Sequence, residues 1–125
     1  MKAEVAPTMR VLVVEDCEDT AASMAMLLRL WGHDVRIAHD GISGLETART
    51  FHPDIALLDL QLPRMDGLQM ARQLRAEQAS MRLIALTGFG QDNDRLRCHE
   101  AGFDLHLVKP TEPAELRAIV EGTGN

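Results

Sequence analysis

Short apolar runs alternate along the chain with longer segments of helical spacing, and this alternation constrains the fold more than any other feature. Each run is four or five residues long and is bounded by charged or turn residues; the runs cover 10–14, 35–38, 55–58, 83–86 and 105–108. Such runs are typical of strands that are buried on both faces of a parallel sheet. The sequence therefore predicts five short, central strands.

The five segments that follow these runs have the apolar spacing of amphipathic helices. Their predicted inward residues are Ala21, Met24, Leu27, Leu28 and Trp31 before a stop at Gly32, then Leu45 and Ala48, then Leu68, Ala71 and Leu74, and finally Leu116, Ile119 and Val120. The fourth helix is expected at about 92–101, and the fifth begins near 111–113. Five alternating strand–helix units predict an α/β fold with helices on both faces. Right-handed crossovers leave few topologies, and we expect a flavodoxin-like, doubly wound sheet of order 2-1-3-4-5.

The chain has the size of one domain, because its 125 residues suit a single hydrophobic core. No repeat, low-complexity tract or long linker divides it. We expect one domain over 10–121, with short tails at 1–9 and 122–125.

Composition excludes several classes of function. The formal net charge of −6 and the scarcity of aromatic residues argue against direct nucleic-acid binding. No apolar run approaches the roughly 20 residues that a membrane-spanning helix needs, and the first ten residues lack the apolar core of a secretory signal. We expect a cytoplasmic protein whose two cysteines, Cys17 and Cys98, are free thiols that pack as small hydrophobic residues.

Polar residues gather at the carboxyl ends of the predicted strands. Glu15 and Asp16 end the first strand, Asp59 the third, Thr87 the fourth and Lys109 the fifth. In an open parallel sheet these ends share one edge, and ligands bind there beside the switch in strand order, which lies between strands 1 and 3. Close carboxylates favour a hard cation such as Mg²⁺. A carboxylate, a metal, a hydroxyl and an ammonium are the groups that phosphoryl transfer uses.

Several of these residues also have simpler interpretations. Glu18 and Asp19 complement the dipole of the first helix, and Asp16 is a possible helix cap. Asp66 with Gly67 is typical of a turn and cap before the third helix. The five histidines show no metal-ligand spacing and are interpreted as surface or packing residues; they are His33, His39, His52, His99 and His106.

Four stretches together resemble the receiver domains of two-component response regulators: VLVVED at 11–16, LLDLQLPRMDG at 57–67, LIALTG at 83–88 and HLVKP at 106–110. The resemblance extends from about residue 10 to residue 121. It implies that Asp59 accepts the phosphoryl group, that Asp16 binds Mg²⁺ directly and that Glu15 acts through water. It also implies a metal contact from the backbone carbonyl of Gln61.

The same resemblance implies that Thr87 is the switch hydroxyl and that Lys109 pairs with the phosphoryl group, with a cis bond between Lys109 and Pro110. The chain departs from the commonest pattern elsewhere. Glu15 replaces the usual Asp, His106 replaces an aromatic switch residue and Thr111 replaces Phe. Gln61 and Phe89 occupy the positions that tune the dephosphorylation rate.

The resemblance implies a signalling module, not an enzyme with a separate substrate. A histidine kinase or a histidine phosphotransfer protein donates the phosphoryl group and docks near Thr20 and Ser23. The domain binds Mg²⁺, for which Mn²⁺ can substitute, and is expected to be a monomer or a weak dimer. The sequence from Leu86 to Pro110 is also similar to the receivers of hybrid histidine kinases. An aspartyl-phosphate phosphatase would need a second Asp at Gln61 and a cap insertion. A flavin binder would need a less acidic first loop, and the intact site residues argue against a degenerate interaction module.

Overall fold

The computed structural model describes residues 8–88 and 95–122. Five strands alternate with five helices in the order β1 (Arg10–Val14), α1 (Glu18–Leu30), β2 (Asp34–Ala38), α2 (Gly41–Phe51), β3 (Ile55–Asp59), α3 (Gly67–Glu77), β4 (Arg82–Gly88), α4 (Arg95–Ala101), β5 (Leu105–Lys109) and α5 (Pro113–Glu121). Every predicted strand and helix is present. The expected start of the fourth helix, near residue 92, lies outside the described residues.

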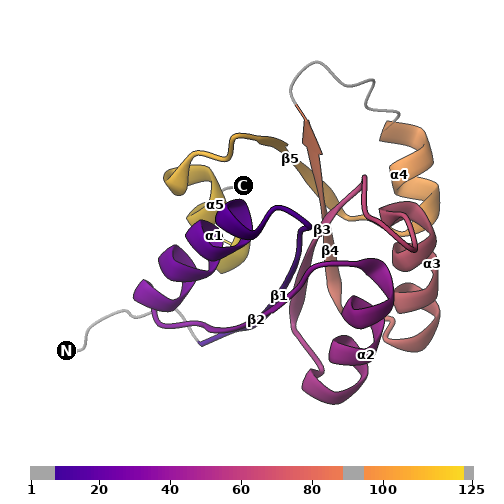
Figure 1. Ribbon diagram of the computed structural model, residues 1–125, viewed down its shortest axis with the longest axis horizontal. Helices are drawn as coiled ribbons and strands as arrows, with labels where there is room; N and C mark the ends of the chain where they lie inside the picture. The colour runs from indigo at the N-terminus through magenta and orange to yellow at the C-terminus, as the bar shows by residue number, and fades with distance from the viewer. Residues whose placement is uncertain (1–7, 89–94, 123–125) are drawn as a thin grey trace.

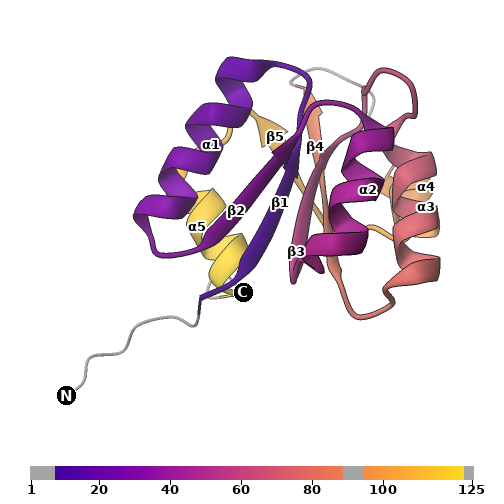
Figure 2. The same ribbon diagram turned by 60° about the horizontal axis from the view of Figure 1, so that its bottom comes forward.

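All strand pairs are parallel, and the strand order is β2-β1-β3-β4-β5. The predicted flavodoxin-like topology is therefore confirmed. α1 and α5 cover one face of the sheet, and α2, α3 and α4 cover the other (Figures 1 and 2). Because β1 and β3 are neighbours while their helices leave on opposite faces, a crevice opens above their carboxyl ends.

Two apolar layers hold the helices to the sheet. Every residue of β3 is buried, and successive side chains enter opposite layers, Leu57 toward α1 and α5 and Leu58 toward α2 and α3. The predicted inward residues lie in these layers, with Leu27, Trp31, Leu68 and Ile119 at their partly buried margins. Met70, which was not predicted, is fully buried. This central β3 gives Asp59 a rigid support.

The two cysteines differ in environment. Cys98 is buried in the layer under α4, as predicted, but Cys17 is exposed at the position that precedes α1. The packing prediction for Cys17 is wrong because the chain turns away from the sheet after Glu15. Cys17 and Cys98 are not joined in a disulfide.

His33 is the one histidine in the core of the described residues, and it joins the two ends of the domain. Its Nδ1 accepts a hydrogen bond from the backbone N–H of Met9 (3.1 Å), which leaves Nε2–H to donate to Glu121 at 3.1 Å. This agrees with its interpretation as a packing residue. Within the described ranges, none of the helices has the length and hydrophobicity to cross a membrane.

Candidate functional site

Three carboxylates meet at the carboxyl ends of β1 and β3. Val14 is in register with Leu58, so the residues that follow, Glu15 and Asp59, are neighbours across the ladder. One carboxylate oxygen each from Glu15, Asp16 and Asp59 lies within 4.8 Å of the others. Glu15 and Asp59 are buried, whereas Asp16 is exposed at the crevice mouth. The predicted acidic cluster is therefore present.

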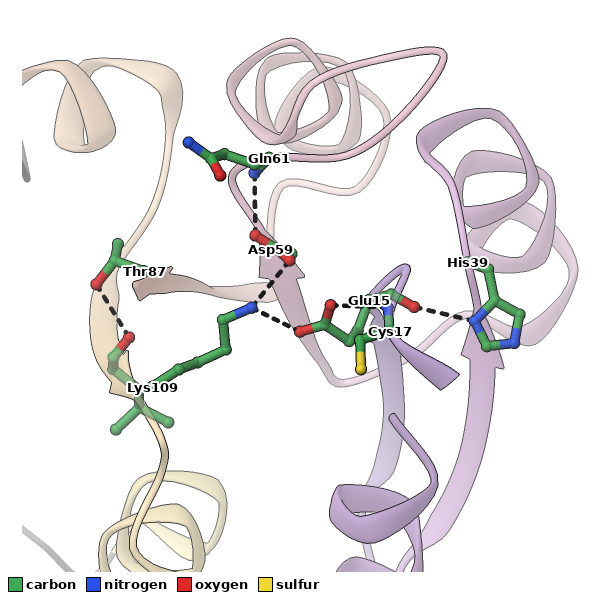
Figure 3. A network of polar contacts seen from close by, with 8 residues as sticks. Glu15, Cys17, His39, Asp59, Gln61, Thr87 and Lys109 are labelled. Carbon is green, nitrogen blue, oxygen red and sulfur yellow. Dashed lines mark hydrogen bonds and ion pairs between the residues drawn. The ribbon is translucent and has the colours of Figure 1, made fainter. Parts of the chain in front are cut away.

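Lys109 crosses from the end of β5 to bridge two of these carboxylates (Figure 3). Its Nζ lies 2.8 Å from Oε1 of Glu15 and 3.0 Å from Oδ2 of Asp59. The peptide bond that follows, between Lys109 and Pro110, is cis, as the resemblance implied. Lys109 thus neutralises part of the negative charge in the crevice.

Burial and pairing act in opposite directions on the two partners. Burial raises the pKa of the Glu15 carboxyl, and the hydrogen bonds from Lys109 and from the backbone of Cys17 only partly offset it. Burial lowers the pKa of the Lys109 ammonium, but its hydrogen bonds to Glu15 and Asp59 outweigh that effect and the pKa is raised. Lys109 therefore stays cationic at neutral pH, beside the carboxylate of Asp59.

Backbone groups orient the two buried carboxylates. The N–H of Gln61 donates to Oδ1 of Asp59 at 3.0 Å, and the N–H of Cys17 donates to Oε2 of Glu15 at 3.1 Å. Each oxygen of Asp59 therefore has one protein donor and keeps lone-pair capacity for a cation or a phosphorus atom. The resemblance implied a metal contact from the carbonyl of Gln61; the contact that the structure gives is that of its N–H with Asp59.

His39 belongs to the same edge and was not predicted as a site residue. Its Nδ1 lies 2.9 Å from the carbonyl oxygen of Glu15 and donates to it (Figure 3). His39 directly follows a predicted strand, and the same position identified Asp59 and Lys109 as site residues. The histidines show no metal-ligand spacing, however, so the sequence suggested no role for His39.

Thr87 is buried at the end of β4, and its hydroxyl points toward β5. Oγ1 donates to the carbonyl oxygen of Leu107 at 3.3 Å (Figure 3). This bond uses the single hydrogen of the hydroxyl group.

A cavity of about 260 Å³ lies between α4 and the sheet, beside Thr87. Its lining also includes Cys98, Phe103 and the half-buried His106. Phe89, the second position expected to tune dephosphorylation, lies outside the described residues.

The structure distinguishes among the helix-cap and helix-dipole interpretations of the other acidic residues. Cys17, not Asp16, precedes the first turn of α1, so the capping interpretation of Asp16 is wrong. Asp66 does cap α3, because its side chain accepts from the N–H of Gln69 at 2.9 Å. Glu18 and Asp19 lie in the first turn of α1, where they complement the helix dipole.

The donor set fits a hard divalent cation. Among the residues that the structure describes, three carboxylates face one ammonium, so this part of the crevice carries an excess of negative charge. Carboxylate oxygens, with a backbone carbonyl and water, are the ligands that Mg²⁺ prefers.

Comparison with known proteins agrees with this geometry. Residues 11–121 match the response regulator receiver domain family. The chain is 36% identical over 110 residues to the response regulator MprA of Mycobacterium avium, which covers 88% of this chain and 48% of that protein. It is 34% identical over 112 residues to the alkaline phosphatase synthesis transcriptional regulatory protein PhoP of Bacillus subtilis. This match covers 90% of this chain and 47% of that protein. The chain thus spans about half the length of these curated relatives.

A solved structure shares the fold. The receiver domain of the sensor histidine kinase PA1611 from Pseudomonas aeruginosa, solved with a magnesium ion in its active site cleft, superimposes with a TM-score of 0.83. It is 32% identical, with 93% of this chain and 97% of that chain covered. The match to the family model spans nearly all of the described fold and every strand end that contributes to the crevice. The chain therefore belongs to the response regulator receiver domain family.

Proposed function

We propose that this domain accepts a phosphoryl group on Asp59 from a phosphohistidine of a histidine kinase or a histidine phosphotransfer protein. The observation that carries the proposal is the position of Asp59. Its carboxylate ends the central strand β3, lies between the ammonium of Lys109 and the N–H of Gln61, and has Glu15 and Asp16 beside it. Asp66 instead caps α3, and Lys109 pairs with Glu15 and Asp59.

In the transfer step, a carboxylate oxygen of Asp59 attacks the phosphorus atom of the phosphohistidine. A phosphorus–oxygen bond forms while the phosphorus–nitrogen bond breaks, and the electron pair of the broken bond stays on the donor imidazole. Lys109, 3.0 Å from Asp59, stabilises the charge on the phosphoryl oxygens. Thr87 then releases the carbonyl of Leu107 and donates to a phosphoryl oxygen, which couples the site to β5.

Asp16, Asp59 and the backbone carbonyl of Gln61 would hold Mg²⁺ directly, and Glu15 through water; Mn²⁺ would serve in its place. The cation supplies charge neutralisation for the transferring group. The indirect role of Glu15 rests on the resemblance to receiver domains; its two carboxylate oxygens accept hydrogen bonds from Lys109 and from Cys17.

The donor would dock over α1 and the connection that follows β5. A hollow of about 560 Å³ lies there, lined by Thr20, Ser23 and Leu27 of α1 and by Lys109 and Thr111 of the other side. Because Lys109 borders both this hollow and the crevice, a donor seated here brings its phosphohistidine close to Asp59. Ser23 variants should slow transfer from a protein donor and leave small-molecule labelling unchanged.

The domain would act as a cytoplasmic signalling module over residues 10–121, with tails at 1–9 and 122–125, and turn over no separate substrate. We expect a monomer or a weak dimer that does not itself bind nucleic acid. The similarity to the receiver of a sensor histidine kinase favours a phosphorelay. p-Nitrophenyl phosphate should not be hydrolysed, which separates this function from that of a phosphatase.

Phosphorylation by acetyl phosphate tests the central assignment. Wild-type protein with Mg²⁺ should gain the mass of one phosphoryl group, and borohydride reduction followed by peptide mapping should place it on Asp59. Asp59→Asn keeps the shape and loses the nucleophile, so it should not be labelled, and EDTA should prevent labelling of wild type. Label on Asp16, or undiminished label in Asp59→Asn, would refute the proposal.

A further inference from the structure

The connection between β3 and α3 is a closed loop with both ends at Asp59. The N–H of Gly67 donates to the carbonyl of Leu60 at 3.1 Å, which closes its base. Gly67 approaches so closely that a Cβ there would lie 2.5 Å from the carbonyl oxygen of Asp59. Gln61, the first exposed residue of the loop, donates its N–H to Asp59. A shift of this loop therefore moves the groups around Asp59.

The far end of the loop is tied to the start of α2. Nη1 of Arg64 lies 3.3 Å from Oδ2 of Asp40, and Oδ1 of Asp40 accepts from the N–H of Ser43 at 2.8 Å, as the cap of α2. The two backbones touch beside this ion pair, since a Cβ on Gly41 would lie 2.5 Å from the carbonyl oxygen of Met65. α2 thus provides a rigid support for the loop.

Arg64 occupies this position in an unfavourable backbone conformation. Its φ is 71°, in the left-handed region where a residue with a side chain is strained. Its ion pair with Asp40 is solvent-exposed on the arginine side, and such pairs contribute little to stability. Stability alone would therefore favour glycine at this position. An arginine is better explained by what the ion pair positions than by how much it stabilises.

We propose that Arg64 is a positioning residue for the cation site. By pairing with Asp40 it holds the loop in the conformation that presents Gln61 to the cation and to Asp59, and so it strengthens Mg²⁺ binding without touching the ion. This inference rests on the proposed Mg²⁺ site.

The sign of the effect separates this role from simple electrostatics. Removal of a positive charge near an acidic crevice should by itself strengthen cation binding. Loss of the tether should weaken it instead. An exposed ion pair can transmit to the cation site no more free energy than it contributes itself, so we expect Arg64→Ala and Arg64→Gly to raise the Kd for Mg²⁺ by about threefold to fivefold.

Isothermal titration calorimetry of the full chain with Mg²⁺ measures this change. Arg64→Lys keeps a cation and should recover part of the affinity, and Asp40→Asn keeps a capping oxygen and should weaken binding. Arg49→Ala is the matched control, because it removes the same charge from an exposed ion pair, with Glu77, at the last turn of α2. Its Kd should change by less than about twofold.

A second measurement removes stability as an explanation. Arg64→Gly relieves the strained φ and should unfold at the same temperature as wild type or above it, while it binds Mg²⁺ more weakly and its Gln61 amide exchanges hydrogen faster. If wild type binds Mg²⁺ and Asp16→Asn does not, the proposed metal site stands. Unchanged or tighter Mg²⁺ binding in Arg64→Ala and Arg64→Gly would then overturn only the positioning role of Arg64. Absence of Mg²⁺ binding in wild type would overturn the proposed metal site, and this inference with it.

Discussion

At the scale of single residues, the crevice brings like charges together at a cost in stability. Glu15, Asp16 and Asp59 repel one another, and Lys109 pairs with only two of them. Asp16→Asn removes one charge from this cluster, so without Mg²⁺ the variant should melt a few degrees above wild type.

The same substitution should abolish stabilisation by the cation. At a Mg²⁺ concentration of 100 times the Kd, wild type should gain about 2.7 kcal/mol, and Asp16→Asn should gain far less. Thermal unfolding with and without Mg²⁺ measures both effects. Asp19→Asn, in the first turn of α1, is the control and should retain the Mg²⁺ response. A lower melting temperature for metal-free Asp16→Asn would contradict the repulsion argument.

At the scale of elements, the start of α3 is pressed against the end of β3. Gly67→Ala would bring a methyl group against the backbone of Asp59 and Leu60, which cannot yield without moving the site. We expect a loss of about 1–3 kcal/mol in the free energy of unfolding, together with weaker Mg²⁺ binding.

Gly44→Ala, inside α2, provides the comparison for Gly67→Ala. There the new methyl group meets chiefly the side chain of Met70, which is flexible, and alanine is the better helix former. The two variants should therefore differ clearly in chemical denaturation. Equal losses in the free energy of unfolding would show that the close contact of Gly67 with Asp59 costs no more than an ordinary contact in the core.

The cap of α2 makes stability depend on pH. The backbone N–H of Ser43 lowers the pKa of Asp40, with a smaller contribution from the charge of Arg64. Because the folded state favours the ionised form, this stabilisation is present above the ordinary pKa of an aspartate and is lost as pH falls through the lower, folded-state pKa.

Asp40→Asn should reveal this dependence. Wild type should be the more stable protein above about pH 5, and the difference should shrink below about pH 4. Urea unfolding at a series of pH values measures the difference. A difference that does not vary with pH would contradict a role for the charge of Asp40.

At the scale of the whole molecule, the site and Trp31 lie at opposite ends of α1. The 13 residues of this helix span about 20 Å at 1.5 Å per residue. The ring of Trp31 stacks instead with Arg117 of α5, whose guanidinium carbon lies 5.2 Å from its centroid.

Mg²⁺ should therefore leave the fluorescence of Trp31 nearly unchanged, whereas Arg117→Ala should alter it. A fluorescence titration with Mg²⁺, with the Arg117→Ala spectrum as the reference for a local change, checks this. Strong quenching by Mg²⁺ would show that the crevice communicates with the far end of α1.

The parallel α/β architecture and the place of the acidic crevice follow from the sequence alone. Local periodicity encodes which segments form strands and helices, and the right-handed crossover rule leaves few ways to arrange them. Since parallel strands end at one edge, Asp16, Asp59 and Lys109 were predicted to meet without any knowledge of coordinates. The capping role of Asp66 was predicted as well, because a cap is a local property of the chain.

The partner of each polar group depends on the tertiary structure. The hydroxyl of Thr87 faces Leu107, and the exposure of Cys17 depends on how the chain leaves β1. The pairing of Arg64 with Asp40 joins two loops that are 24 residues apart in the sequence. Such contacts depend on strand register, loop conformation and the packing of neighbouring elements, which no local pattern encodes. The residue types and the edge they share follow from the sequence, but their hydrogen bonds follow from the fold.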